Sequence, residues 1–216
     1  MTAPDERRAR LAAARLYLVI EAAPARSVVP AALAGGVDVV QLRDKHAPDS
    51  EVVEAGRWLR DSGALFVIND RPDLALECGA DGVHVGQDDM PVDEVRSLVG
   101  PDVLIGLSTH SPMQVDAAIE NPDVDYLGVG PVWETTTKPG RAAVGLELVE
   151  HAAGAAASKS WFAIGGIDAE RAPQVVEAGA ERLAVVRAVR DAADPRAAAR
   201  MLREAIDMER VGGQAQ

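Results

Sequence analysis

Two aspartates, Asp70 and Asp89, each follow a short apolar run with the pattern of a buried strand. Residues 65–68 precede the first aspartate, and residues 82–85 lie just before the second. The segment between the two runs opens with Pro72 and closes with a glycine, which predicts a helix. A strand, helix, strand unit of this length makes the two strands parallel, so their C-terminal ends meet on one face.

Two carboxylates at neighbouring strand ends suit a Mg²⁺ ion that carries a phosphorylated substrate. Mg²⁺ usually takes one or two carboxylates and leaves its other positions to water and phosphate oxygens. The alternative is that Asp70 and Asp89 simply cap helices and loops. The pair alone does not decide between these interpretations.

Further polar side chains follow another predicted strand, residues 38–42. Gln41, Arg43 and Lys45 alternate along the chain, so an extended backbone would present them on the same side. Two cations and an amide suit a diphosphate and the edge of a heterocycle. An ordinary solvated strand end is the alternative.

The loops after the last three predicted strands carry groups that suit phosphate. They contain hydroxyls, a lysine, a glycine pair that lets backbone amides approach a ligand, and a segment leading into a helix. The residues are Thr135, Thr137, Lys138, Gly165, Gly166, Val186 and Arg187. Two phosphate-binding regions in one site indicate two phosphorylated substrates.

The histidines give a weaker signal. His84 lies within a predicted strand, where a hydrogen-bonded core histidine is a better interpretation than a catalyst. His110 lies on a loop and is the stronger candidate of the two. The sequence contains no Gly-x-Ser-x-Gly elbow, zinc-type Cys/His cluster or Walker loop.

The elements that must position these residues repeat as strands, each followed by a helix. The predicted strands are 16–20, 38–42, 65–68, 82–85, 103–107, 126–129, 161–164 and 182–186. The predicted helices are 27–34, 49–61, 72–79, 91–99, 112–120, 146–157, 169–178 and 195–208, after a leading helix at 4–14. Most strands are nearly continuous apolar runs, as expected when helices cover both faces.

This pattern predicts an α/β fold, a single (β/α)8 TIM barrel with an extra N-terminal helix. Its active site would lie at the C-terminal strand ends. The rival is an open doubly wound sheet, which usually has a glycine-rich turn after its first strand. Residues 21–25 contain no glycine, so the barrel is favoured.

Length and charge limit the partners. We expect one barrel domain over residues 1–210 and a disordered tail at 211–216. The net charge of −12 argues against nucleic acid and anionic membranes, so an anionic substrate needs local cations. Cys78 is the only cysteine, and no targeting or membrane-spanning segment is evident. We expect a cytoplasmic protein with small-molecule substrates, and the sequence leaves homo-oligomer formation open.

Together, these motifs resemble the thiamine-phosphate synthase (thiamine-phosphate pyrophosphorylase) family over nearly the whole chain. The resemblance rests on residues 41–45, 69–70, 84–89, 106–108, 130–138 and 163–167. Each segment is short, but the set in this order is specific. It implies a TIM-barrel transferase that joins hydroxymethylpyrimidine diphosphate to hydroxyethylthiazole phosphate, or its carboxylated form, and releases pyrophosphate.

The resemblance also implies roles for individual residues. Mg²⁺ would bind Asp70 and Asp89. The diphosphate would contact Arg43, Lys45, Asn69, Ser108 and Lys138. The pyrimidine would contact Gln41. The thiazole phosphate would contact Thr135, Thr137, the Gly166 backbone and the segment at Val186 and Arg187. In the family the diphosphate is thought to leave first. The thiazole nitrogen then attacks with its free lone pair and has no proton to lose, so no general base is needed. Catalysis then consists of stabilising the leaving group, mainly through Arg43, Lys45, Ser108 and Lys138.

Two departures from the family pattern concern the thiazole-phosphate region. Arg187 stands where a small serine is more usual, and Trp133-Glu134 is bulkier and more charged than usual. Two rival functions remain at this point. A thiazole-phosphate tautomerase would need a histidine base and no diphosphate contacts, and a non-catalytic thiamine-phosphate-binding protein would not need the complete set of leaving-group contacts.

Overall fold

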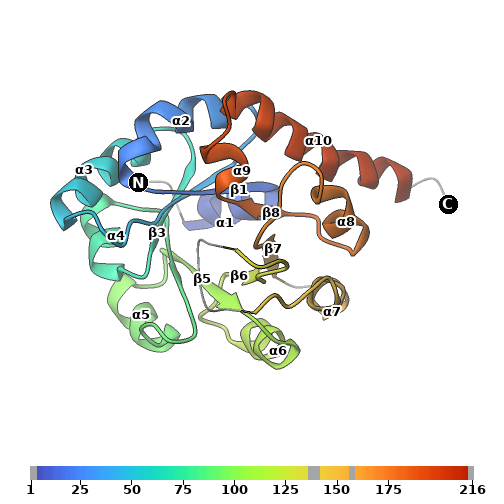
Figure 1. The fold of residues 1–216 in the computed structure, drawn as a ribbon. Helices are drawn as coiled ribbons and strands as arrows, with labels where there is room; N and C mark the ends of the chain where they lie inside the picture. Colours follow the sequence, from blue (N-terminus) through green and yellow to red (C-terminus); the bar gives the residue numbers. More distant parts are fainter. Residues whose placement is uncertain (1–3, 136–141, 156–158, 214–216) are drawn as a thin grey trace.

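The computed structural model describes residues 4–135, 142–155 and 159–213, and side chains up to residue 208. Eight parallel strands form a closed barrel in which each strand pairs with its neighbours in sequence and β1 pairs with β8 (Figure 1). The strands are β1 Leu16–Ile20, β2 Val39–Leu42, β3 Leu65–Asn69, β4 Gly82–Val85, β5 Leu104–Thr109, β6 Tyr126–Val129, β7 Ser160–Ile164 and β8 Leu183–Val185. The closure confirms the predicted TIM barrel and excludes the open sheet.

In Figure 1 the helices form a ring around the strands, except for α1, which lies behind them. They are α1 Pro4–Ala13, α2 Ala22–Ala34, α3 Asp49–Arg60, α4 Pro72–Cys78, α5 Val92–Val99, α6 Pro112–Glu120, α7 Glu147–Ala155, α8 Ala172–Glu177, α9 Arg187–Arg190 and α10 Pro195–Gly213. In the described chain, none of these helices is long and apolar enough to cross a membrane.

Three helix boundaries differ from the predicted ones by three residues or more. Helix α2 begins at Ala22 rather than residue 27 and contains Pro30, although a proline in a helix interior removes one backbone hydrogen bond. Helix α8 begins at Ala172 because Asp168 first accepts the backbone N–H groups of Glu170 and Arg171 in a local turn. The final helix continues to Gly213, whereas the prediction ended it at residue 208, and residues 214–216 lie outside the described chain.

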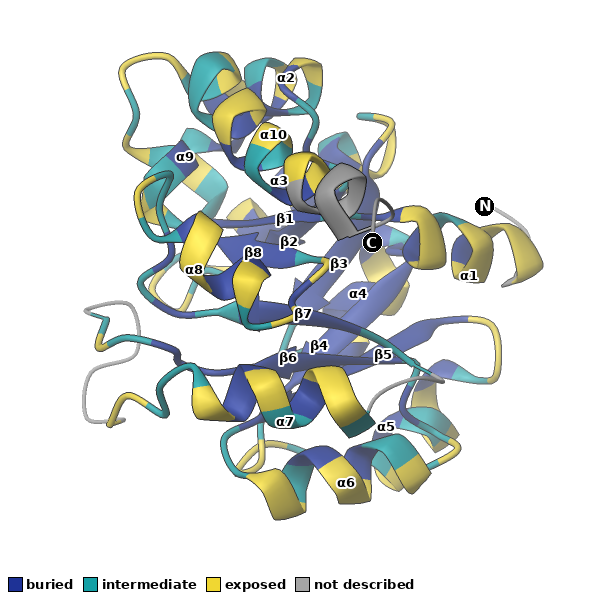
Figure 2. Cartoon of the chain, turned by 90° about the vertical axis from the view of Figure 1, so that its right-hand side faces the viewer, coloured by how far each residue is buried: buried dark blue, intermediate teal, exposed yellow. Residues whose placement is uncertain are grey.

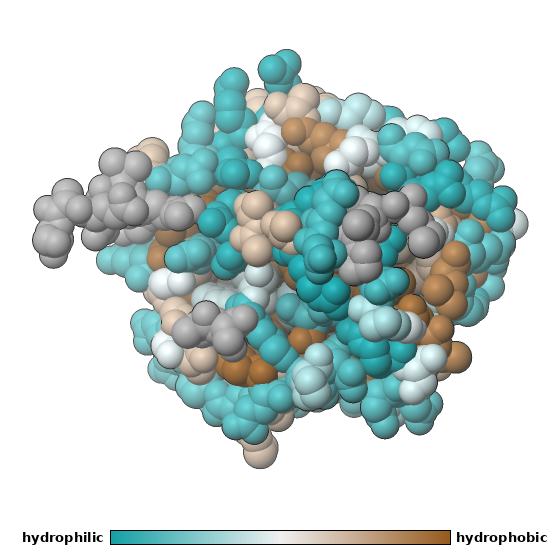
Figure 3. Space-filling view, turned by 180° about the vertical axis from the view of Figure 1, so that it is seen from behind, coloured by the Kyte–Doolittle hydropathy of each residue, from teal (hydrophilic) through white to brown (hydrophobic). Residues whose placement is uncertain are grey.

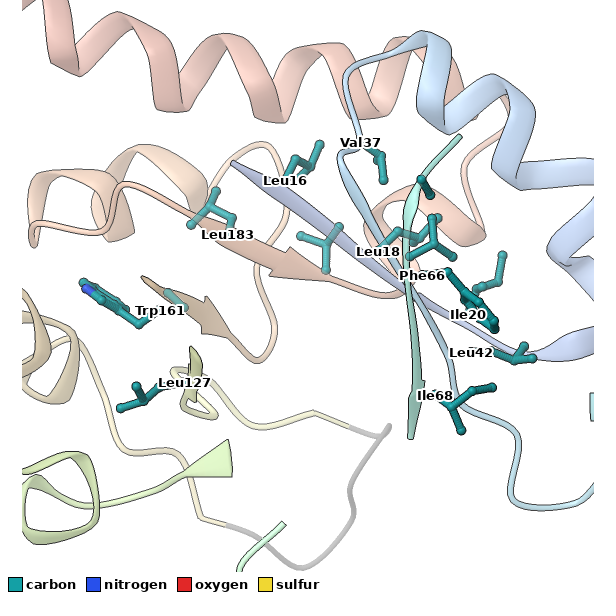
Figure 4. Close-up of a cluster of buried hydrophobic side chains, with 14 of the residues drawn as sticks. Leu16, Leu18, Ile20, Val37, Leu42, Phe66, Ile68, Leu127, Trp161 and Leu183 are labelled. Carbon is teal, nitrogen blue, oxygen red and sulfur yellow. The ribbon is translucent and has the colours of Figure 1, made fainter. Parts of the chain in front are cut away.

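Side chains alternate along each strand between two separate cores. Leu16, Leu18 and Ile20 of β1 face the surrounding helices and join the large core between strands and helices (Figure 4). Tyr17 and Val19, between them in sequence, face inward and join the core inside the barrel. Figure 2 shows the result: the strands are buried over most of their length, while the helices are exposed on their outer faces. Inward-facing side chains near the C-terminal strand ends are therefore available to form a functional site.

Helix α1 covers the N-terminal end of the barrel. Its Leu11 belongs to the core inside the barrel and is 4% exposed. Arg7, 2% exposed, donates from Nε to Asp81 Oδ1 (3.0 Å) and from Nη1 to the carbonyl of Asp102 (3.0 Å). Asp81 in turn accepts the backbone N–H of Phe66 (3.0 Å), so one buried ion pair ties α1 to β3 and β4.

Replacing Arg7 with alanine should lower the free energy of unfolding by about 3 kcal/mol, because the buried Asp81 carboxylate loses its cation. Urea denaturation followed by circular dichroism measures this change. Arg8→Ala is the matched control, since the Arg8–Asp125 pair lies at the same end but the Arg8 side chain is 44% exposed, and it should cost less than about 1 kcal/mol. Equal costs for the two variants would contradict the assignment of Arg7 as the buried anchor of α1.

The outer surface agrees with the strongly acidic composition. The face in Figure 3 is mostly hydrophilic, with apolar areas that are small and scattered. Isolated apolar side chains such as Met113 (77% exposed) are common on soluble domains and need no partner.

Candidate active site

A cavity of about 340 Å³ opens at the C-terminal ends of the strands and extends into the barrel. The polar groups predicted from the sequence converge on it from β2, β3 and β5 and from the loops after β6, β7 and β8. The predicted site residues that line it are Gln41, Arg43, Asn69, Ser108, Thr135, Gly166, Val186 and Arg187. Lys45, Asp70 and Asp89 form a separate cluster beside it, and Thr137 and Lys138 lie outside the described residues.

The two aspartates meet, as the strand, helix, strand pattern predicts. Asp70 has a left-handed backbone (φ 58°), and its N–H donates to the carbonyl of His84 on the neighbouring strand (2.8 Å). Aspartate and asparagine adopt this conformation more readily than most residues. Its carboxylate lies within hydrogen-bonding reach of Asp89, and Lys45 Nζ lies 3.3 Å from Asp70 Oδ2. Asp89 is held by the N–H of Gly86, which donates to Oδ2 (2.7 Å).

Electrostatics make this pair a good cation site. Burial raises the pKa of Asp70 above its ordinary value of 3.8, the neighbouring Asp89 carboxylate raises it further, and Lys45 opposes both. Two close carboxylates repel each other, and a divalent cation relieves that repulsion. Within the described ranges no group of three or more His, Cys, Asp or Glu side chains could hold a metal. The pair therefore fits Mg²⁺, which needs few protein ligands when it also binds water and phosphate.

In the metal-free protein, Asp70→Asn should raise the melting temperature at neutral pH. The pKa of Asp70 is higher in the folded state than in the unfolded state. The protonated carboxyl therefore stabilises the folded state fully below the unfolded-state pKa, and this stabilisation is lost as pH rises through the folded-state pKa. The neutral amide removes that loss, so the advantage of the variant should grow as pH rises from below 3.8 through the raised pKa of Asp70.

Thermal melts in a chelating buffer at several pH values test this expectation. Asp88→Asn, one residue from Asp89 and exposed, is the control and should melt like the wild type. A variant that melts below the wild type at neutral pH would show that Asp70 is a structural cap and not a strained metal ligand.

Arg43 brings an unsatisfied positive group to the cavity. Its backbone N–H donates to Ile20 at the end of β1 (2.8 Å), which fixes the direction of the chain after β2. Its side-chain Nε is buried and has no hydrogen-bond partner among the described residues. A buried unpaired donor costs free energy, and an anion bound in the cavity would satisfy it.

The loops after β6 and β7 pack so closely that glycine is required. At Gly165 (φ 109°) a Cβ would lie 2.5 Å from the Cα of Pro131, and at Gly166 (φ 66°) it would lie 2.8 Å from the Cβ of Trp133. Arg171 then donates to the Gly166 carbonyl (2.8 Å) and stacks over the Trp133 ring at 5.1 Å. Arg171 also lines the cavity, and sequence reasoning missed it because it lies in a turn six residues beyond the glycine pair.

The histidine interpretations had mixed outcomes. His84 is buried and hydrogen-bonded, as expected of a core residue, yet it also lines the cavity and contacts Ser108. His110 lines the cavity too, and its Nδ1 bonds to the carbonyl of Gly130. The sequence analysis also missed Tyr17 and Tyr126, which form the floor of the cavity, although their inward positions follow from strand alternation.

A closed parallel barrel with a cavity at the C-terminal strand ends, lined by both apolar and polar side chains, has the architecture of a TIM-barrel enzyme. Residues 16–189 match the family model described as thiamine monophosphate synthase. The chain is similar to thiamine-phosphate synthase from Mycobacterium tuberculosis (strain ATCC 25177 / H37Ra), with 51% identity over 91% of this chain and 96% of the relative. The relative from Acidothermus cellulolyticus, also a thiamine-phosphate synthase, is 50% identical over 89% of this chain and 94% of its own.

A solved structure, thiamine phosphate pyrophosphorylase from Pyrococcus furiosus, superposes with a TM-score of 0.81 and 34% identity, and covers 93% of this chain and 98% of that one. The chain belongs to the thiamine monophosphate synthase family and is a transferase. The resemblance inferred from the short sequence motifs is thereby confirmed.

Proposed function

We propose that this transferase joins hydroxymethylpyrimidine diphosphate to hydroxyethylthiazole phosphate, or its carboxylated form, and releases pyrophosphate. One observation carries the proposal. The paired carboxylates of Asp70 and Asp89 and the buried, unsatisfied Nε of Arg43 follow adjacent strands of the same barrel mouth. A metal site beside an arginine whose Nε–H has no acceptor among the described residues suits a diphosphate leaving group.

We propose that Asp70 and Asp89 hold Mg²⁺, because their oxygen donors and mutual repulsion fit that ion. Bound there, the ion would supply positive charge to the oxygens of the departing diphosphate. Lys45, 3.3 Å from Asp70, would add a second positive charge at the same place. The Lys45 side chain is 55% exposed, so it can turn from Asp70 toward a phosphate oxygen.

The remaining lining residues would bind and orient the two substrates. Arg43 would bind the diphosphate through its Nε–H, which has no partner among the described residues, and Asn69 and Ser108 would donate to it from β3 and β5. Gln41 would bind the pyrimidine edge. Thr135, the Gly166 backbone and the segment of Val186 and Arg187 would bind the thiazole phosphate. For Thr137 and Lys138 the sequence resemblance alone supports the same roles.

In the proposed reaction the bond between the pyrimidine methylene carbon and the diphosphate oxygen breaks first, and both bonding electrons leave with pyrophosphate. The lone pair of the thiazole nitrogen then forms the new carbon–nitrogen bond. With the uncarboxylated thiazole phosphate no proton moves, so the site needs no general base. The carboxylated form would in addition lose its carboxyl group as CO2, and the ring carbon that carried it would take up a proton from water. The protein's contribution is charge stabilisation at the leaving group and alignment of the two rings.

The buried, unpaired thiol of Cys78 suits a reducing compartment, and we propose that the enzyme works in the cytoplasm. Its substrates are small molecules, and the negative net charge does not favour nucleic acid.

The decisive experiment supplies both proposed substrates with Mg²⁺ and quantifies the products. Thiamine phosphate and pyrophosphate should form in equal amounts, and omission of either substrate should abolish both products. Isomerisation of a thiazole phosphate without pyrophosphate release would instead identify a tautomerase. Binding of thiamine phosphate without turnover would identify a non-catalytic binding protein.

A further inference from the structure

An unbroken chain of hydrogen bonds crosses the floor of the cavity. Nε2 of Gln41 donates to the hydroxyl of Tyr17 (2.9 Å), which lies 3.0 Å from the hydroxyl of Tyr126. That hydroxyl lies 3.2 Å from Nδ1 of His84, and Nε2 of His84 lies 2.9 Å from Oγ of Ser108. The chain therefore connects the residue proposed to bind the pyrimidine with a residue proposed to bind the diphosphate.

The backbone of β5 makes room for this chain. His84 on β4 and Tyr126 on β6 are both in register with Gly106 on the strand between them. A Cβ at position 106 would lie 2.4 Å from His84 Nδ1 and 2.2 Å from Tyr126 Cζ. The two side chains meet across β5 because residue 106 has no side chain.

The order of donors and acceptors follows from the first bond. Tyr17 accepts from Gln41, so its own hydrogen goes to Tyr126, because a buried hydroxyl without an acceptor is costly. Tyr126 then donates to Nδ1 of His84, which must be unprotonated. Neutral His84 carries its proton on Nε2 and donates to Oγ of Ser108. Ser108 is left with its hydroxyl hydrogen free to point at a ligand.

Both tyrosine hydroxyls stay protonated at physiological pH, which supports this order of donors and acceptors. Burial raises the pKa of Tyr17 and of Tyr126 well above the ordinary value of 10.0, so both hydroxyls keep their hydrogens. The reverse order would require the Gln41 amide to turn so that Oε1 accepts from Tyr17, and it would turn the lone pairs of Ser108 toward the cavity. An anionic substrate would oppose that arrangement.

We propose that Tyr17, Tyr126 and His84 are positioning residues that fix Ser108 as a hydrogen-bond donor toward the diphosphate and leave Oε1 of Gln41 as an acceptor for an amino group on the heterocycle. This inference rests on the proposed function for the identity of the two ligands. The proton order itself does not depend on it.

Nuclear magnetic resonance of protein with isotope-labelled histidine tests the proton order directly, since long-range proton–nitrogen spectra distinguish the two neutral tautomers. The protein has four histidines, and the His84 signals are assigned by their loss in the variant His84→Gln. If that variant does not fold, His46, His110 and His151 are replaced in turn and His84 is assigned by elimination. We expect the Nε2–H tautomer in the wild type near neutral pH, with and without inorganic pyrophosphate and Mg²⁺.

Two matched variants separate the links of the chain. Both Tyr17→Phe and Tyr126→Phe keep the ring that packs edge-on against Phe162. Tyr126→Phe should abolish the tautomer preference of His84 and raise KM for the pyrimidine diphosphate up to about tenfold. Tyr17→Phe removes only the Gln41 link, so His84 should keep its tautomer while KM for the pyrimidine substrate still rises.

An Nδ1–H tautomer in the wild type, or an unchanged His84 spectrum in Tyr126→Phe, would overturn the inference. Product formation by the wild type is measured in parallel. Absence of thiamine phosphate would refute the proposed function and the ligand assignments with it, whereas the spectra decide the proton order in either case.

Discussion

Asp89→Asn should lower kcat at least about 100-fold while the protein remains folded, because removal of one carboxylate weakens the site that stabilises the leaving diphosphate. The substitution keeps the shape of the side chain, and the amide oxygen can still accept the N–H of Gly86 that holds Asp89. The loss should therefore come from charge and not from local structure. Steady-state kinetics over a Mg²⁺ titration measures both kcat and the metal requirement.

Asp88→Asn is the appropriate control because it removes a neighbouring carboxylate from the same exposed turn. It should retain the activity and Mg²⁺ dependence of the wild type. If Asp89→Asn retained the wild-type kcat at saturating substrates and Mg²⁺, the proposed metal site would be wrong. If Asp88→Asn lost as much as Asp89→Asn, the effect would be general to the turn, and Asp89 would have no specific role.

Arg43→Met should lower kcat/KM about 100-fold or more without lowering stability. Methionine keeps most of the side-chain length but removes the guanidinium that would bind the diphosphate. Because Arg43 Nε is buried and has no hydrogen-bond partner within the part of the chain that the structure describes, its removal should leave the free energy of unfolding equal or higher. Opposite effects on activity and stability distinguish a binding residue from a structural one.

Arg43→Lys separates charge from geometry, since lysine keeps the charge but not the planar fork of donors, and it should have intermediate activity. Arg26→Met is the matched control on the surface of α2, where Arg26 forms an exposed pair with Glu54. Its kinetics should equal those of the wild type. A destabilised but fully active Arg43→Met would show that Arg43 only supports the fold.

The barrel could be predicted because its signals are local. Each strand is a short apolar run bounded by turn residues, and strand–helix repetition allows few topologies. The same logic placed Asp70 and Asp89 at neighbouring strand ends, and Gln41 and Arg43 at the end of β2, before any coordinates. Element ends were predicted less well, as at Ala22 and Ala172. At Ala22 the side chain of Asp44, which is distant in sequence, accepts the N–H (3.2 Å), and at Ala172 a local turn around Asp168 delays the helix.

The amino-acid sequence by itself determined the fold, the family and which charged groups share the barrel mouth, since periodicity and strand direction follow from neighbouring residues. Only the tertiary structure decided that Asp89 lies close enough to raise the pKa of Asp70, and that Arg43 Nε is buried with no partner in residues 4–135, 142–155 and 159–208. It also decided that His84 joins Tyr126 to Ser108. These contacts join residues from different strands, and their distances depend on how the closed barrel brings inward side chains together, which no local pattern specifies.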